Sequence, residues 1–169
     1  IGITPYTGSD TFTQIEANAR TRMNFGPDDR LTAAFRGRVG ATLGPSFSNI
    51  PINKRYFAGG GSSVRGYGFQ AIGPQDALGD PLGGRSVIEA AVEGRFRVLK
   101  SVQLAAFADV GNVSESPFPE LSGEYFLGAG GGIRYLTPVG PIRVDIAVPL
   151  DKRDGDRSFQ LYTSLGQPF

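Results

Sequence analysis

The 169-residue chain contains no cysteine, no histidine and no tryptophan, and it has a single methionine. Without cysteine it has no disulfide framework, and without cysteine and histidine it has no Cys/His metal site. The absence of histidine also removes the usual general base and the Ser-His-Asp triad. No run approaches the roughly 18 consecutive apolar residues of a membrane helix. A helical span is therefore excluded, whereas a transmembrane β-barrel is not, because alternating strands have a much weaker hydropathy signal.

Positive and negative charges are almost balanced, with 17 lysines and arginines against 16 aspartates and glutamates. The resulting net charge of +1 implies neither a nucleic-acid partner nor an acidic protein partner. Residues 1–5 lack both the basic start and the apolar core of a secretory signal peptide. We therefore expect a piece that starts inside a larger protein, with a length that suits one domain.

Seven segments alternate between apolar and polar residues and are bounded by glycine, proline, aspartate and asparagine. Glycines inside several of these segments disfavour helices there. Residues 1–5 are compatible with the end of an eighth strand. The expected strands are 12–23, 31–43, 86–99, 102–110, 125–136, 142–150 and 159–165.

The charged residues of these segments share one face of their strands. In 86–99, for example, Glu93 and Arg95 alternate with Val92 and Phe96. Because successive side chains of a strand point to opposite faces, one face is charged and the other carries no charge. The remaining charged positions of this kind are Glu16, Arg20, Arg22, Arg36, Arg38, Glu89, Arg97, Asp109, Arg134, Arg143 and Asp145.

Two structures produce such a pattern: a soluble antiparallel sandwich, whose charged face meets water, and a membrane barrel, whose apolar face meets lipid. Segment length favours the barrel, because about ten residues cross a bilayer at a tilt, whereas soluble strands average about five or six. Aromatic residues at segment ends and the alternation of short with long connections favour it too. We therefore predict an all-β fold, an antiparallel transmembrane β-barrel. The short connections are 26–29, 100–101 and 137–141, and the long ones are 44–85, 111–124 and 151–157.

The longest connection contains the run Arg-Tyr-Phe-Ala-Gly-Gly-Gly-Ser-Ser-Val-Arg-Gly-Tyr over residues 55–67. This run resembles the signature loop of the TamA/BamA superfamily of outer-membrane assembly factors. Three further motifs follow in the order of that superfamily: Phe-Ala-Asp-Val-Gly at 107–111, Thr-Pro-Val-Gly-Pro at 137–141, and a C-terminal segment ending in phenylalanine at 161–169. The paired glycines before the arginine motif and the Pro-Val-Gly-Pro turn resemble TamA-like more closely than BamA-like proteins.

The resemblance implies a barrel of sixteen strands preceded by periplasmic POTRA domains, of which residues 1–169 would supply the C-terminal seven to eight strands. Sheet edges left open in lipid cost several kcal/mol for each unpaired backbone group. We therefore expect the edges to be paired with further strands, by closure into a smaller barrel, or in an oligomer. The resemblance also implies residence in the bacterial outer membrane, contacts with the lipid bilayer and with unfolded outer-membrane client proteins, no cofactor and no nucleic acid.

In the superfamily, the loop folds back into the lumen and its arginine, here Arg65, pairs with acids on the barrel wall. The matching positions are Glu93 and Asp109, which lie on the charged face. A guanidinium between two carboxylates would form charge-assisted hydrogen bonds, and flanking glycines such as Gly66 would let the backbone approach the wall. Tyr67 completes the motif. The alternative is a solvated loop arginine beside wall charges that only balance one another in a polar lumen.

The last strand is where the resemblance implies a weak seam at which a client strand adds by β-augmentation. Its C-terminal β-signal would consist of Leu161, Thr163, Leu165 and Phe169.

Non-catalytic insertion or translocation of β-rich clients is the first functional hypothesis, and no residue pattern supports an enzyme or a metal site. Two hypotheses stay open beside it: a passive channel or two-partner secretion pore, and the membrane anchor of a fused patatin-like enzyme.

Overall fold

The computed structural model describes residues 2–6, 11–44, 46–120, 122–153 and 155–165. They form eight strands and three short 3-10 helices, and no α-helix occurs among them. Within these ranges, no helix is long and apolar enough to cross a membrane. The strands are β1 (Gly2–Tyr6), β2 (Phe12–Phe25), β3 (Leu31–Leu43), β4 (Ser86–Leu99), β5 (Val102–Ser114), β6 (Phe126–Thr137), β7 (Gly140–Pro149) and β8 (Gln160–Leu165), and the 3-10 helices are η1 (Pro27–Asp29), η2 (Phe47–Asn49) and η3 (Ile52–Lys54).

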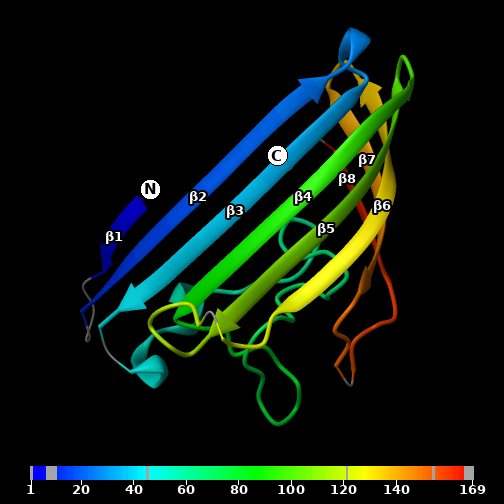
Figure 1. Cartoon of the computed structure of the whole chain (residues 1–169). Helices are drawn as coiled ribbons and strands as arrows, with labels where there is room; N and C mark the ends of the chain where they lie inside the picture. The colour runs from blue at the N-terminus through cyan, green and yellow to red at the C-terminus, as the bar shows by residue number, and fades with distance from the viewer. Residues whose placement is uncertain (1, 7–10, 45, 121, 154, 166–169) are drawn as a thin grey trace.

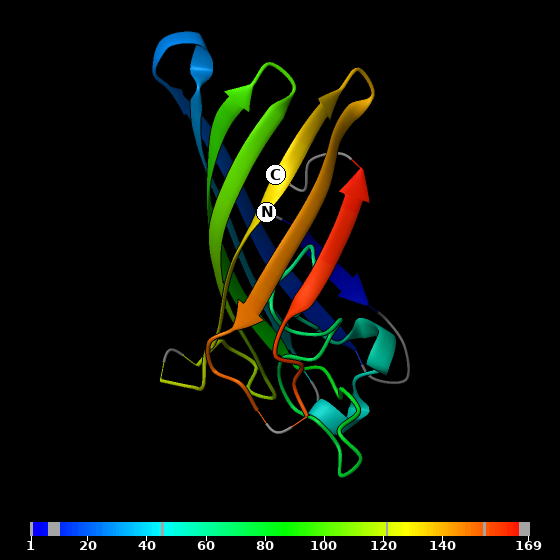
Figure 2. The ribbon, with the colours of Figure 1, turned by 90° about the vertical axis from the view of Figure 1, so that its right-hand side faces the viewer.

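All eight strands belong to one antiparallel sheet in which each strand pairs with its neighbours in the sequence (Figure 1). The predicted all-β antiparallel fold is thereby confirmed. The sheet curls, so that it has a concave and a convex side (Figures 1 and 2). It does not close, because among the described residues β1 pairs only with β2 and β8 only with β7. Closure of this chain into a smaller barrel, one of the expected alternatives, is therefore not realised.

The strand boundaries agree with the expected ones to within a few residues. The strands β3 and β4 begin and end at the expected residues, Leu31–Leu43 and Ser86–Leu99. The largest difference is in β5, which continues past the expected end at Val110 to Ser114. Residues 111–114 continue the ladder with β4, and this pairing outweighs the turn preference of the glycine and asparagine there.

The two faces of the sheet have opposite chemistry. Glu93, Asp109 and Asp145 point to the concave face and are at most 3 % exposed. Phe35 and Val92 point to the convex face and are 40 % and 42 % exposed. In a soluble sandwich a second sheet would cover the apolar face, and none does so in the described part of the chain. An apolar outer face and a charged inner one are typical of a transmembrane barrel, and we call the concave face the lumenal face.

Residues 46–85 of the long loop between β3 and β4 turn back into the concave side of the sheet (Figure 2). The short connections lie at the opposite end of the strands (Figures 1 and 2). The buried apolar core lies between this loop and the lumenal face, which holds the loop against the sheet. It consists of Tyr56, Ala58, Val64, Tyr67, Ile72, Val87, Val113 and Phe126.

Candidate functional site

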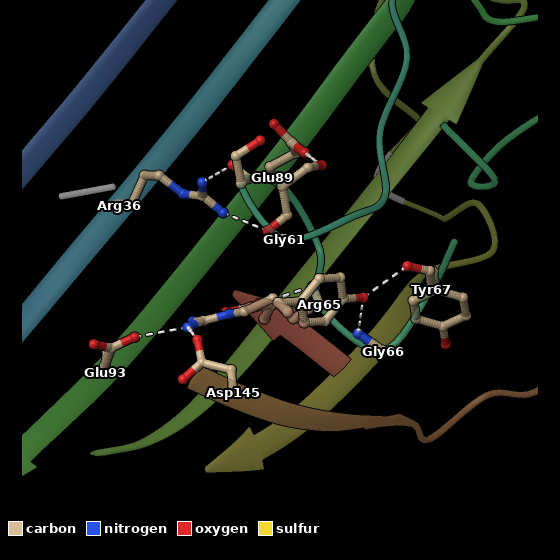
Figure 3. Close-up of polar contacts among 12 residues, drawn as sticks. Arg36, Gly61, Arg65, Gly66, Tyr67, Glu89, Glu93 and Asp145 are labelled. Atoms are coloured by element: carbon tan, nitrogen blue, oxygen red, sulfur yellow. Dashed lines mark hydrogen bonds and ion pairs between the residues drawn. The ribbon is translucent and has the colours of Figure 1, made fainter. Parts of the chain in front are cut away.

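The long loop carries Arg65 to the lumenal face, where the residue is 2 % exposed. Asp109 of β5 accepts three hydrogen bonds from it: from the backbone N–H at 2.9 Å, from Nε at 2.7 Å and from Nη2 at 2.8 Å. The remaining nitrogen, Nη1, donates to Glu93 of β4 at 2.7 Å. Bidentate pairing with one carboxylate and a further bond to a second make this a strong, directional contact. Figure 3 shows Arg65 reaching from the loop toward Glu93.

A third carboxylate and further arginines extend this contact into a buried cluster. Asp145 of β7 lies 3.6 Å from Nη1 of Arg65 (Figure 3). Arg134 of β6 bridges Glu93, at 3.1 Å, and Asp145. Breaking a buried ion pair by removing one partner is strongly destabilising, so the cluster holds the loop in one place. We call the cluster the loop lock, and its members are Arg65, Glu93, Arg95, Asp109, Arg134, Arg143 and Asp145.

The Phe-Ala-Asp-Val-Gly motif of β5 presents three successive lumenal positions to the loop. Phe107 lies beneath the guanidinium of Arg65, whose central carbon is 3.4 Å from the ring centroid in a cation–π arrangement. Asp109 supplies the carboxylate. Gly111 leaves room for Val64, because a Cβ at Gly111 would lie 2.7 Å from Cγ2 of that side chain. The spacing of the motif therefore follows from strand alternation, which places an aromatic ring, a carboxylate and a glycine without a side chain on the same face.

Gly66 and Tyr67 carry the loop past β6 and β7. Gly66 has a φ of +104°, where glycine is favoured, and a Cβ there would lie 2.7 Å from the carbonyl oxygen of Val148. The hydroxyl of the buried Tyr67 lies 2.9 Å from the carbonyl oxygen of Leu127 and 3.0 Å from that of Asp151. Burial raises the pKa of the Tyr67 phenol, so the hydroxyl keeps the proton that it donates.

Glycines of β6 create the space that the loop and the lock occupy. A Cβ at Gly128 would overlap the carbonyl oxygen of Arg65. A Cβ at Gly132 would overlap the carboxylate of Asp145. Gly128 and Gly132 are thus explained by close approach of the loop backbone and of a buried acid to the wall.

A second set of contacts tethers the loop just before Arg65. Arg36 of β3 donates to the carbonyl oxygens of Ser62 and Ser63 (Figure 3). The hydroxyl of Ser63 donates to the carboxylate of Glu89 and accepts from the N–H of Gly59 at 2.8 Å. These bonds satisfy backbone groups that a buried loop cannot leave unpaired.

Electrostatics keeps Arg65 charged in spite of its burial. Burial alone lowers the pKa of the guanidinium, but the hydrogen bonds and charges of Asp109 and Glu93 outweigh it and hold the pKa above its ordinary value. The loop lock has four arginines against three carboxylates. The intact cluster therefore has one positive charge in excess, and loss of any one carboxylate raises this excess to two.

The structure brings the loop and wall residues named from the sequence into one site and leaves no solvated loop arginine at position 65. Sequence reasoning placed Asp145 on the charged face but did not connect it with Arg65. The alternation of the strand places Asp145 on the charged face. Many other residues lie on that face too, so the pattern does not identify Asp145 as a partner of Arg65. The residues named from the sequence that meet in this site are Arg65, Gly66, Tyr67, Glu93 and Asp109.

The residues named as the β-signal take no part in the loop lock. Leu161, Thr163 and Leu165 point outward from β8 and are exposed. Phe169 lies outside the described residues. Their inward neighbour Tyr162, which sequence reasoning did not single out, hydrogen-bonds to the backbone of the long loop.

The residues of the site hold the long loop against the sheet. Within the described ranges, no group of three or more metal-ligating side chains comes together. The lock's carboxylates are engaged by arginines, and the ion pairs of Arg65 join the loop to the wall, while the others join wall residues to one another. The arrangement can hold a loop inside a curled sheet against strong perturbation.

Residues 2–169 match the model of the Omp85 superfamily domain. The chain belongs to the Omp85 superfamily. It is 30 % identical over 171 residues to the outer membrane protein assembly factor BamA of Nitratidesulfovibrio vulgaris, a match that covers 98 % of this chain and 21 % of that protein. It is 26 % identical over 173 residues to BamA of Neisseria meningitidis serogroup B, covering 82 % and 22 %. A SAM50-like protein of Schizosaccharomyces pombe is 25 % identical over 138 residues, covering 75 % and 29 %.

The fold is similar to the crystal structure of BamA from Haemophilus ducreyi lacking POTRA domains 1–3. The TM-score is 0.73 at 22 % identity, and the match covers 90 % of this chain and 34 % of that one. The superfamily and the bacterial outer-membrane location predicted from the sequence are thereby confirmed, while the TamA-like subtype stays a prediction. The chain spans about a fifth of the length of its BamA relatives.

Proposed function

We propose that this chain is part of the membrane barrel of an assembly factor that inserts or translocates β-rich client proteins at the outer membrane, without catalysing a covalent reaction. Membership of the Omp85 superfamily and similarity to proteins named as assembly factors support this function. The single observation that carries it is the loop lock, in which the signature arginine, Arg65, is buried between Asp109 and Glu93.

The two parts of the chain have complementary roles in this proposal. The loop lock braces the lumenal wall, because paired buried charges resist displacement. At the sheet edge, β8 is the last described strand and, among the described residues, pairs only with β7. A client strand adds to that edge by backbone hydrogen bonding, while Leu161, Thr163 and Leu165 face lipid. POTRA domains upstream in the whole protein deliver the unfolded client, and further strands complete the barrel around the loop.

The proposal is tested with the full-length protein in lipid vesicles supplied with an unfolded β-barrel client. Folding of the client is followed by its protection from protease and its heat-modifiable migration on a gel. We expect Arg65→Ala to slow client folding strongly. Arg20→Ala is the matched control, since Arg20 lies on the same face, is exposed, and has no ion pair among the described residues. It should leave client folding near the wild-type rate.

Two outcomes would replace the proposal. Conductance across a planar bilayer without any acceleration of client folding would indicate a passive or secretion pore. If the Arg65→Ala variant accelerated client folding as much as the wild type does, the loop lock would not be needed for assembly. Comparing an autotransporter with an ordinary barrel as client tests the TamA-like assignment, which predicts a preference for the autotransporter.

A further inference from the structure

Tyr162 of β8 forms a bridge between that strand and the long loop. Its hydroxyl accepts a hydrogen bond from the N–H of Gly66 at 3.0 Å and donates one to the carbonyl oxygen of Tyr67 at 2.8 Å. Figure 3 shows both of these bonds at Gly66 and Tyr67. The ring of Tyr162 also lies against the loop at Gly61, where a Cβ would be 2.8 Å from Cδ1. One side chain thus contacts the loop on both sides of Arg65.

An aromatic ring without a hydroxyl group could not form the two hydrogen bonds of Tyr162. A phenol both donates and accepts, and here it uses both capacities on neighbouring backbone groups. Phenylalanine at Tyr162 would leave the N–H of Gly66 and the carbonyl of Tyr67 without this partner. Unpaired buried backbone groups are unfavourable, so the loop would shift or open at this point.

The bridge joins a firmly held element to a weakly held one. On the loop side, Arg65 is fixed by Asp109 and Glu93. On the strand side, β8 is held, among the described residues, by its pairing with β7 alone. A contact between such elements constrains the weaker one, because the loop's position limits where β8 can lie.

We propose that Tyr162 is a positioning residue that couples β8 to the loop lock, so that strand and loop loosen together. The coupling is reciprocal by thermodynamic linkage: release of the loop loosens β8, and displacement of β8 loosens the loop. This inference concerns the protein without any client and goes beyond the proposed function. In a protein that admits client strands beside β8, strand entry and loop release would become one event, and that consequence rests on the proposed function.

Hydrogen–deuterium exchange of the full-length protein in lipid nanodiscs, without client, tests the coupling. The peptides to follow cover 59–67 of the loop and 160–165 of β8, in wild type, Arg65→Ala, Tyr162→Phe and the double variant. We expect Arg65→Ala to raise exchange in β8 about threefold to tenfold, the range for loss of one net hydrogen bond. Tyr162→Phe should raise exchange in the loop by a similar factor. In the double variant, release of the loop should add nothing further in β8, because the link is already absent.

Tyr135→Phe is the matched control, since it removes a hydroxyl from an outward-facing tyrosine of β6 that is 52 % exposed. It should leave both peptides at wild-type exchange. The coupling is overturned if β8 stays protected in Arg65→Ala. It is also overturned if Arg65→Ala raises exchange in β8 by the same factor in the Tyr162→Phe background as in the wild-type background. Should Arg65→Ala not fold, Arg65→Lys serves as the gentler loop-releasing change. Failure here leaves the client-folding assay unaffected, so the two proposals fail separately.

Discussion

Asp109 accepts three hydrogen bonds from Arg65, and one of them comes from the backbone N–H. This carboxylate therefore fixes both the guanidinium and the path of the chain that carries it. Glu93 accepts a single bond from Arg65 on one oxygen, and its other oxygen accepts from Arg95 and Arg134. Asp109 is thus the dedicated partner of the loop, and Glu93 connects the loop with Arg95 of its own strand and with Arg134 of β6.

Asp109→Asn should release the long loop. The substitution keeps the shape of the side chain but removes the charge opposite a buried guanidinium. Breaking a buried pair in this way costs about 3–5 kcal/mol. We expect a lower midpoint of denaturant-induced unfolding and faster protease cleavage within 44–85. The control is Glu16→Gln, which breaks the partly exposed pair with Arg38 and should cost at most about 1 kcal/mol. Equal effects of the two changes would contradict the special role of Asp109.

Arg65→Lys should fail to restore the lock although it preserves the charge. An ammonium group is a point charge and cannot reproduce the planar fork that meets Asp109 with two nitrogens and Glu93 with a third. We expect a loss of about 1.5–3 kcal/mol, as for a hydrogen bond to a charged group. The rate at which protease cleaves the loop measures it. Wild-type protection in this variant would show that charge alone holds the loop.

Gly128→Ala should displace the loop through the added methyl group. Its Cβ would overlap the carbonyl oxygen of Arg65, which is backbone and cannot turn aside as a flexible side chain can. Gly94→Ala is the matched control, because Gly94 also lies in a wall strand and nothing lies within 4 Å of a Cβ there. We expect increased hydrogen exchange of residues 59–67 in the first variant and none in the second. A loop that stays protected in Gly128→Ala would show that the backbone approach is looser than the structure has it.

Tyr67→Phe should lower stability in a pH-dependent way. Removing the hydroxyl takes this donor away from the carbonyl of Asp151 and from that of Leu127, which keeps the N–H of Leu150, at a cost of about 1–3 kcal/mol. Burial raises the pKa of the Tyr67 phenol above its ordinary value of about 10, so the folded protein holds the proton more tightly than the unfolded chain. Its contribution is therefore complete below about pH 10 and is lost as the pH rises through the folded-state pKa.

The unfolding midpoint of wild type and of Tyr67→Phe, measured from pH 8 upward, checks this prediction. The difference between the two proteins should be constant up to about pH 10 and shrink above it. A difference that is independent of pH throughout would show that the ring, and not the hydroxyl proton, accounts for the effect.

An arginine on the convex face should impair membrane insertion. Val92 lies near the middle of β4 and points outward, so Val92→Arg places a charge in hydrocarbon at a cost of about 2–4 kcal/mol. Asn18→Arg introduces the same side chain at an exposed lumenal position of β2. The fraction of protein that folds into lipid vesicles should fall in the first variant only. Equal folding of both would contradict a lipid-facing convex surface.

The alternation of residue types alone determined which side chains share a face. Glu93, Asp109 and Asp145 fall on one side because side-chain direction in a strand depends only on position along it. Strand boundaries were predictable for the same reason, except where pairing with β4 extended β5 to Ser114. The spacing of Phe107, Asp109 and Gly111 likewise belongs to the sequence, since every second residue returns to the same face.

Only the tertiary structure decided which of these groups meet. Asp145 lies beside Arg65, and Tyr162 hydrogen-bonds to the loop directly after Arg65, at Gly66. Both contacts arise because the sheet curls and the long loop folds back across several strands. Curl and loop path come from the packing of residues far apart in the chain, and no local pattern encodes them. Parity assigns a side chain to the lumen, but its partner there depends on the curvature that brings distant strands together.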